Sequence, residues 1–163
     1  MNKIVKLTVD NIEPFDLVNT ILPVENEFKN TAYGLSLDDF RKWLVKQSNW
    51  AKGIDLPFGY VPQIIYWFYV DNTPVGMGKI RLELTESSKH VGGNIGYAIG
   101  SNYRGKGYGT IFLKLLIKEA KSIGVDDILL TVEKYNPSSK RAVEKAGGIL
   151  INDSNERWYF IFK

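Results

Sequence analysis

A glycine-rich stretch in the second half of the chain has the residue types and spacing to bind an anion. It reads Tyr-Arg-Gly-Lys-Gly-Tyr-Gly-Thr over residues 103–110, between a predicted strand and a predicted helix. Glycines let backbone N–H groups approach a ligand closely, and the first turn of a helix leaves about four N–H groups unpaired. The helix N-terminus also carries a partial positive charge. The sequence therefore predicts a phosphate-binding loop made of Arg104, Gly105, Lys106, Gly107, Tyr108, Gly109 and Thr110.

Two common nucleotide-binding motifs fit this loop poorly. Residues 100–106 spell G-x-x-x-x-G-K, but Gly107 follows where a P-loop has the hydroxyl that holds magnesium. The dinucleotide motif G-x-G-x-x-G also fails, because Thr110 stands where its last glycine belongs. A nucleotide-binding protein is therefore the weaker hypothesis, and we expect no magnesium-dependent ATP binding.

Composition excludes several other chemistries. The 163 residues contain no cysteine and one histidine, His90, so thiolate nucleophiles, disulfides and histidine-rich metal sites are excluded. The net charge of +3 is too balanced to favour nucleic acid as a partner. No apolar run reaches the ~18 residues that cross a bilayer, and the N-terminal residues lack the apolar block of a signal peptide. We expect a cytoplasmic protein with no metal, no nucleic acid and no membrane partner.

The pattern of apolar residues predicts the elements that position the loop. Alternation and β-branched or aromatic runs predict strands, and three- to four-residue spacing predicts helices. The predicted strands are 3–9, 61–70, 75–85, 94–99, 127–133, 149–151 and 158–162. The predicted helices are 14–27, 36–50, from the end of the glycine-rich turn to about 123, and 137–146. A polar loop is expected over 86–93. The order predicts a mixed α+β (α/β) fold, with a single central sheet of about seven strands and about four flanking helices, in one domain over residues 1–163.

Two segments together resemble a known family. Arg104, Gly107 and Gly109 fit the pattern [QR]-x-x-G-x-[GA], and the preceding strand reads Asn-Ile-Gly-Tyr-Ala-Ile. Residues 136–147, Asn-Pro-Ser-Ser-Lys-Arg-Ala-Val-Glu-Lys-Ala-Gly, resemble a second conserved pattern, N-x-x-[AS]-x-x-x-x-E-K-x-G. Over about residues 75–148 the chain is similar to the GNAT superfamily of N-acetyltransferases.

The resemblance implies acetyl-CoA as co-substrate. The amides from Arg104 to Thr110 would hold the pyrophosphate. The strand around Tyr97, Ala98 and Ile99 would diverge from its parallel neighbour and pair with the pantetheine arm. Asn136 and Ser139 would lie near the arm or the thioester, although Asn136 is equally well explained as a helix N-cap. Homodimers are common in the family, so a homodimer is also expected, although no interface is recognisable in the sequence.

Acetyl transfer to an amine sets the requirements for catalysis. The ammonium must lose a proton, the thioester carbonyl must be polarised, and the thiolate must leave. A backbone N–H near Ala98 or Ile99 is the expected polarising donor. The family's usual acid, a tyrosine seven residues after the asparagine, is Val143 here. Tyr97, Tyr103 or Tyr135 could take its place; Tyr97 is nominated as the acid, although nothing in the spacing selects among the three. Glu83 is predicted as the base, with Glu133 and Glu86 as alternatives, and Trp50, Phe58 and Tyr60 are candidates for the acceptor pocket.

These inferences favour an N-acetyltransferase that moves an acetyl group from acetyl-CoA to a primary amine of a small molecule or peptide. The amine would attack directly, with a carboxylate or a water-relayed base. The alternative is a non-catalytic acyl-CoA-binding regulatory module of the same fold, suggested by Val143. The sequence does not identify the acceptor amine.

Overall fold

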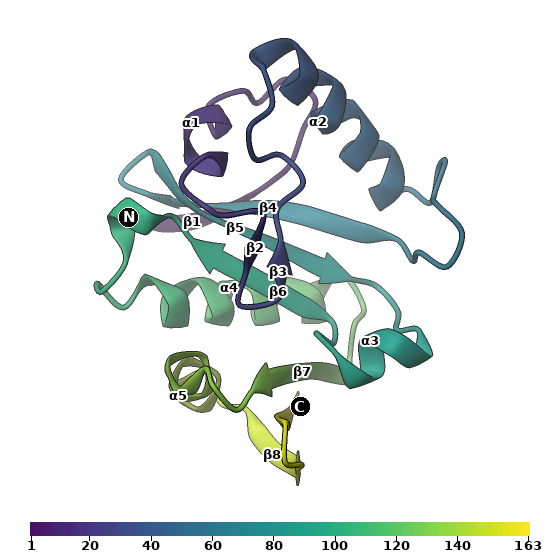
Figure 1. The fold of residues 1–163 in the computed structure, drawn as a ribbon, viewed down its shortest axis with the longest axis vertical. Coiled ribbons are helices and arrows are strands. Elements are labelled where there is room, and N and C mark those ends of the chain that lie inside the picture. Colours follow the sequence, from purple (N-terminus) through teal and green to yellow (C-terminus); the bar gives the residue numbers. More distant parts are fainter.

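The computed structural model describes residues 1–163 as a chain of mixed helices and strands (Figure 1). The strands are β1 (Asn2–Lys6), β2 (Val24–Glu25), β3 (Phe28–Lys29), β4 (Gln63–Val70), β5 (Thr73–Arg81), β6 (Ile95–Ile99), β7 (Ile128–Glu133), β8 (Ile149–Asp153) and β9 (Arg157–Phe162). The α-helices are α1 (Phe15–Val18), α2 (Leu37–Ala51), α3 (Glu86–His90), α4 (Tyr108–Ser122) and α5 (Pro137–Lys145), and a 3-10 turn spans Ser101–Tyr103. The mixed α+β class predicted from the sequence is confirmed.

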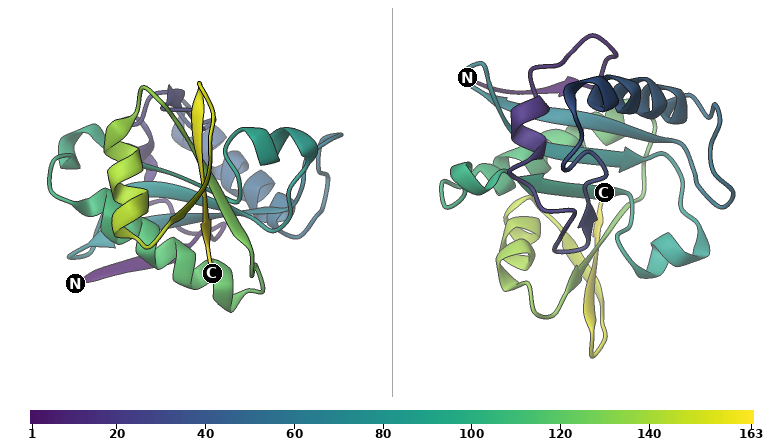
Figure 2. Two further views of the ribbon diagram at one scale, coloured as in Figure 1. Left: turned by 90° about the horizontal axis from the view of Figure 1, so that it is seen from below. Right: turned by 45° about the horizontal axis from the view of Figure 1, so that its top comes forward.

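The strands predicted for a single central sheet form two sheets instead. One has the order β1-β4-β5-β6 and the other β7-β9-β8, while β2 and β3 form a separate hairpin. All pairings are antiparallel. The right-hand view in Figure 2 shows the yellow β8–β9 hairpin projecting away from the four-stranded sheet.

The two sheets are joined at one point. Gly93 and Leu130 form an isolated β-bridge, and the Asn94 amide donates to the Leu129 carbonyl at 2.7 Å. Gly93 has a φ of +71°, and a Cβ on it would lie 2.2 Å from the Leu129 oxygen, so only glycine permits this approach. Beyond this junction β6 and β7 are not paired, although their arrowheads in Figure 1 point to the same side of the molecule.

The alternating pattern of β4 explains why helices cover both faces of the four-stranded sheet. Its residues 64, 66 and 68 pack in one apolar cluster with α4, and residues 65, 67 and 69 pack in the other with α1 and α2. The aromatic run Tyr66 to Tyr69 is therefore part of the core. Figure 1 shows α1 and α2 on one side of this sheet and α4 on the other.

The helices predicted around residues 110–123 and 137–146 are confirmed, as is the helix that begins after Ser36. The Ser36 hydroxyl accepts from the Asp39 amide at 3.1 Å, which is the predicted N-cap. The buried face of α4 comprises Phe112, Leu113, Leu116, Ile117 and Ala120, because the helix packs against both the sheet and Val143 of α5.

Three local predictions are wrong. The helix predicted over 14–27 is only α1, because Asn26 and Glu27 take positive φ values and turn the chain into the β2–β3 hairpin. The loop predicted over 86–93 contains α3, which starts at a capping box on Thr85. The strand predicted to reach residue 85 ends at Arg81, so Glu83 is not on a strand.

Two features are absent from this structure. None of its helices combines the length and apolar character needed to span a bilayer. It contains no group of three or more His, Cys, Asp or Glu side chains arranged to hold a metal ion.

Candidate active site

The glycine-rich loop lines a cavity of about 400 Å³ at the N-terminus of α4. Gly105 and Gly107 have φ values of +77° and +78°, and Gly107 is the N-cap of the helix. The backbone amides from Arg104 to Thr110 donate to no acceptor within the protein. A run of unpaired amides at a helix N-terminus attracts an anion. The structure therefore has the predicted anion-binding geometry in this loop, which we call the amide cradle.

The basic side chains at the amide cradle differ from those predicted. Lys106 is exposed and does not line the cavity. Arg104 lines it, but its Nη2 lies 2.6 Å from Glu25 Oε2 and its Nε donates to the Ile99 carbonyl at 3.0 Å. This ion pair neutralises the one carboxylate in the cavity. Two cations that the sequence analysis missed, Arg141 and Lys145 on α5, also line it. They stand four residues apart in the segment after Asn136, a spacing that would have placed them on one helix face.

Strand β6 presents an unpaired edge to the same cavity. The Arg81 amide donates to Asn94 and the Gly100 amide donates to Val75, at the two ends of the β5–β6 ladder. Because hydrogen-bonded pairs alternate in an antiparallel ladder, Ala98 pairs with β5. The amides of Tyr97 and Ile99 therefore point to the opposite edge of β6. The Ala98 side chain itself is buried, 8 % exposed.

A second cavity, of about 460 Å³, meets the first at a few shared residues. Asn26, Tyr97, Asn136 and Ser139 line both cavities. The Asn136 side chain caps α5 by accepting from the Ser139 amide at 3.2 Å, so the predicted capping role of Asn136 is confirmed. Burial raises the pKa of Tyr97, while the neighbouring Ser139 hydroxyl opposes that rise. Tyr97 is consequently a protonated phenol at the junction, and a group bound in either cavity can reach it.

Two carboxylates face the second cavity beside the junction. Glu133, at the end of β7, and Glu27, in the β2–β3 turn, both contact the guanidinium of Arg157. Burial and the neighbouring Glu27 carboxylate raise the pKa of Glu133 to about 7. Its Oε2 atom is buried and has no hydrogen-bond partner. A carboxyl group with a pKa near neutrality and a free oxygen atom is suited to accept a proton at physiological pH.

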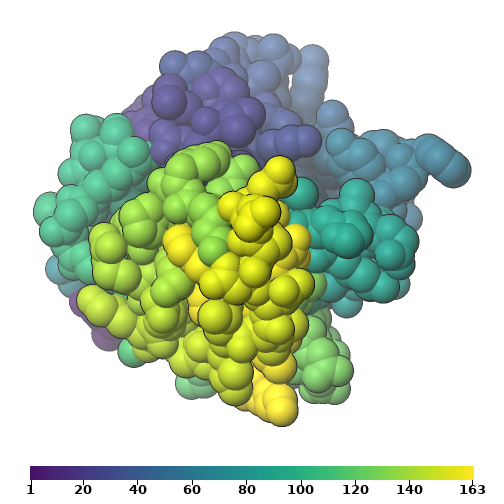
Figure 3. Space-filling view, turned by 60° about the horizontal axis from the view of Figure 1, so that its bottom comes forward, coloured from purple at the N-terminus to yellow at the C-terminus, as the bar shows by residue number.

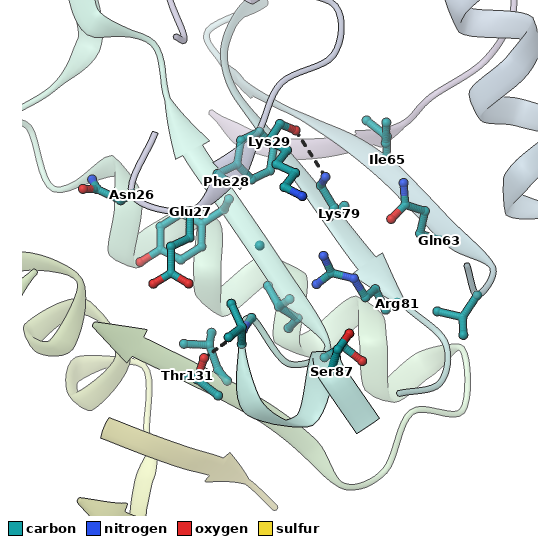
Figure 4. Close-up of a pocket in the computed structure, with 18 of the residues that line it drawn as sticks. Asn26, Glu27, Phe28, Lys29, Gln63, Ile65, Lys79, Arg81, Ser87 and Thr131 are labelled. Atoms are coloured by element: carbon teal, nitrogen blue, oxygen red, sulfur yellow. Dashed lines mark hydrogen bonds between the residues drawn. The ribbon is translucent and has the colours of Figure 1, made fainter. Parts of the chain in front are cut away.

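The wall of the second cavity farther from the junction is cationic (Figure 4). Lys79 and Arg81 project from β5, and Lys29 adds a third positive side chain. Trp50 and Tyr60, predicted as pocket residues, also line this cavity, and their rings meet edge to face with centroids 5.5 Å apart. Gln47 and Gln63 also line this cavity.

Several residues nominated from the sequence lie outside both cavities. Glu83 and Glu86 are exposed and line neither cavity. Tyr135 is 70 % exposed and lines neither cavity. Tyr103 lines the first cavity, which contains the amide cradle, but not the second. Val143 is fully buried in the core. Phe58 is fully exposed, and His90 is also exposed. Of the nominated carboxylates, only Glu133 faces a cavity.

The two cavities lie where the two sheets and the β2–β3 hairpin come together. Figure 3 shows the C-terminal elements, green to yellow, gathered on one face below the purple N-terminal segments. The amide cradle, the junction and the carboxylates thus draw on both sheets and on the β2–β3 hairpin. The arrangement joins an anion site to a cavity that contains a base and a phenol.

Comparison with known proteins identifies the family. A family model described as "Acetyltransferase (GNAT) family" matches residues 28–148, and the chain belongs to this family. No curated protein sequence matches the chain significantly.

Solved structures share the fold at low sequence identity. The Campylobacter jejuni N-acetyltransferase PseH in complex with acetyl coenzyme A is 15 % identical, with a TM-score of 0.65 over 100 % of this chain and 99 % of that chain. The microcin C7 self-immunity acetyltransferase MccE, in complex with acetyl-CoA and AMP, is 16 % identical, with a TM-score of 0.65 over 99 % and 91 % of the two chains. A spermidine N-acetyltransferase SpeG chimera from Vibrio cholerae and hSSAT is 13 % identical, with a TM-score of 0.62 over 98 % and 95 %.

Proposed function

We propose that this protein transfers an acetyl group from acetyl-CoA to a primary amine of a small molecule or peptide. The observation that carries the proposal is the meeting of two cavities at Tyr97, Asn136 and Ser139. One cavity has an amide cradle suited to a diphosphate, and the other contains a carboxyl group suited to deprotonate an amine. Membership of the GNAT family and the acetyl-CoA complexes of PseH and MccE support the same assignment.

Acetyl-CoA fits the first cavity by charge and by backbone geometry. The diphosphate would accept from the amides of residues 104–110, with Arg141 and Lys145 beside it. The pantetheine arm would run along the free edge of β6, where the amides of Tyr97 and Ile99 are unpaired. This course leads the thioester to the junction of the cavities, where one of these amides would donate to its carbonyl oxygen.

Glu133, rather than Glu83, is the proposed base. It would take the proton of the ammonium, directly or through water, because its pKa lies near 7 and it faces the second cavity. The acceptor amine would bind in this cavity, which we therefore call the acceptor cavity. The neutral amine then attacks the thioester carbon, a C–N bond forms, and the C–S bond breaks. Tyr97 would donate its phenolic proton to the departing thiolate, and the second proton, which the nitrogen loses as the amide forms, would return to the phenolate through solvent.

Turnover is the test of this function. The protein is incubated with acetyl-CoA and a panel of primary amines, free CoA thiol is followed over time, and the acetylated amine is identified by mass spectrometry. We expect thiol release that depends on the amine. CoA binding without release for any amine would favour a non-catalytic acyl-CoA-binding module instead, a possibility raised by the buried Val143 at the position of the family's usual acid.

A further inference from the structure

Two buried cations without a counter-anion share the acceptor cavity. Lys79 and Arg81 stand two residues apart on β5, so their side chains leave the same face of the strand. Lys79 is only 9 % exposed, and Arg81 is partly buried. Neither has a carboxylate within 4.0 Å, whereas Arg157 in the same cavity contacts both Glu27 and Glu133. At one end of the cavity, therefore, carboxylates balance the positive charge, and at the other end the positive charge has no carboxylate beside it.

The existing contacts of the two cations are with uncharged groups. The Lys79 ammonium donates to the Lys29 carbonyl at 3.3 Å and lies 4.8 Å from the centroid of the Phe28 ring. One guanidinium nitrogen of Arg81 donates to the Gly93 carbonyl at 3.0 Å. A buried cation without a counter-charge is unfavourable, and an anion placed between two of them relieves that cost. In keeping with this, burial and the charges of Arg81 and Lys29 lower the pKa of Lys79 to about 7.

A buried amide in the same cavity also lacks a partner. Gln47, on α2, is 4 % exposed and lines the cavity, and its Oε1 atom has no hydrogen-bond partner. Buried polar atoms are usually satisfied, so the unpaired Oε1 shows that this chain does not complete the hydrogen bonds of the Gln47 amide. Gln47 is a second observation, independent of charge, that the lining of this cavity is polar.

The charges are arranged along the cavity. Figure 4 shows Lys79 and Arg81 together on one side and Glu27 on the opposite side. Glu27 and Glu133 share Arg157 beside the junction with the amide cradle. An occupant whose ammonium faces the carboxylates and whose anion faces the cations would match both ends.

We propose that the acceptor is an amine bearing an anionic group, a carboxylate or a phosphate, and that Lys79 and Arg81 bind this group. This inference rests on the proposed acetyltransferase function. It makes the two cations determinants of specificity: they select which amine is acetylated and take no part in the chemistry.

Matched pairs of amines test the proposal by kcat/KM. The carboxylate arm compares amino acids and dipeptides having free C-termini with the same compounds as C-terminal amides. The phosphate arm compares O-phosphoethanolamine with ethanolamine. We expect the anionic member to be preferred by about 10- to 100-fold in one arm, the range for a charge-assisted hydrogen bond, and that arm identifies the anion.

Variants assign the preference to the two cations. Lys79→Met and Arg81→Leu should each reduce the preference to about twofold. Lys42→Met is the matched control, because Lys42 is an exposed residue of α2 outside the cavity. It removes the same charge and should leave the preference unchanged. Equal use of both members of every pair, or a preference that survives both variants, would overturn the proposal and leave acetyl transfer intact.

A binding measurement decides the question if no amine is acetylated, which would refute the proposed function. β-Alanine and O-phosphoethanolamine are titrated into the wild type and Lys79→Met by calorimetry, and in the wild type the side-chain nitrogen of Lys79 is also followed by NMR. We expect one of the two to bind the wild type, to raise the pKa of Lys79, and to bind Lys79→Met at least about 10-fold more weakly. Absence of binding by both compounds, or equal affinity for the variant, would overturn the anion site.

Discussion

Glu133 Oε1 lies 3.5 Å from Arg157 Nη1, while the same nitrogen lies 2.7 Å from Glu27 Oε1. The closer contact gives Glu27 the larger share of the guanidinium charge. Glu133 is therefore buried beside a carboxylate with only partial compensation, which accounts for its raised pKa. The geometry divides the two carboxylates into a partner for Arg157 and a candidate base.

Glu133→Gln should lower kcat by about 100- to 10,000-fold, the range for loss of a general base. In the wild type kcat/KM should rise with pH through about 7, as Glu133 loses its proton. The variant should lack this limb and follow only the ionisation of the acceptor amine. Initial rates of thiol release between pH 5.5 and 9 measure both effects, with CoA affinity as the control for folding.

Glu83→Gln is the rival variant, because the sequence pattern favoured Glu83 while the structure leaves that residue exposed. If Glu83→Gln abolishes turnover and Glu133→Gln retains it, the base has been assigned to the wrong carboxylate.

Gly107→Glu should weaken CoA binding by at least about 100-fold, because it puts a negative charge among the amides that would hold the diphosphate. Gly124→Glu is the matched control. Both glycines have positive φ, at the two ends of α4, and a Cβ on either meets no atom within 4 Å. Each substitution should therefore cost a similar strain of about 1 kcal/mol. Calorimetric titration with CoA should separate them, and comparable affinities for the two variants would contradict the cradle.

The parts of the site that the sequence predicted depend on short-range rules. Positive φ at Gly105 and Gly107, the start of α4 and the capping of α5 by Asn136 follow from residues within a few positions of one another. Local backbone preferences are sufficient for such features. The same holds for β4, because its run of β-branched and aromatic residues predicted a strand over 61–70.

The parts that the sequence missed depend on distant segments. Lys79 and Arg81 have the spacing of a solvated strand face, and they are buried because the β2–β3 hairpin, about fifty residues earlier, covers Lys79 and the Gly93 segment meets Arg81. Glu83 continues the same alternation in the sequence. The strand nevertheless ends at Arg81, and the chain enters α3 at the capping box on Thr85. The junction between the two sheets likewise depends on contacts between segments far apart in the sequence, such as the bridge between Gly93 and Leu130. No local pattern encodes these contacts.

Tyr97→Phe should lower kcat by about 10-fold and leave CoA affinity unchanged. The effect is at the low end for a general acid because a thiol of pKa about 8.5 is already a fair leaving group. The ring would keep its edge-to-face contact with Phe112, at 6.3 Å between centroids, so folding should be preserved. Tyr135→Phe, outside both cavities, is the comparison. Single-turnover rates of the two variants measure the difference, and an unchanged rate for Tyr97→Phe would mean that the thiolate leaves without an acid.

The stability of the protein should depend on pH through Lys79. The ordinary lysine pKa is 10.5, and in the folded protein burial, followed by the charges of Arg81 and Lys29, lowers it to about 7. Between these values the unfolded chain binds the proton and the folded chain does not, so raising the pH through this window stabilises the fold. Relative to Lys79→Met, the wild type should therefore gain about 2 to 4 kcal/mol in free energy of unfolding from pH 7 to pH 10. Other lysines titrate alike in both proteins and cancel in the difference. Urea denaturation at the two pH values measures it, and a difference that stays constant would mean that Lys79 is charged in the folded protein at both.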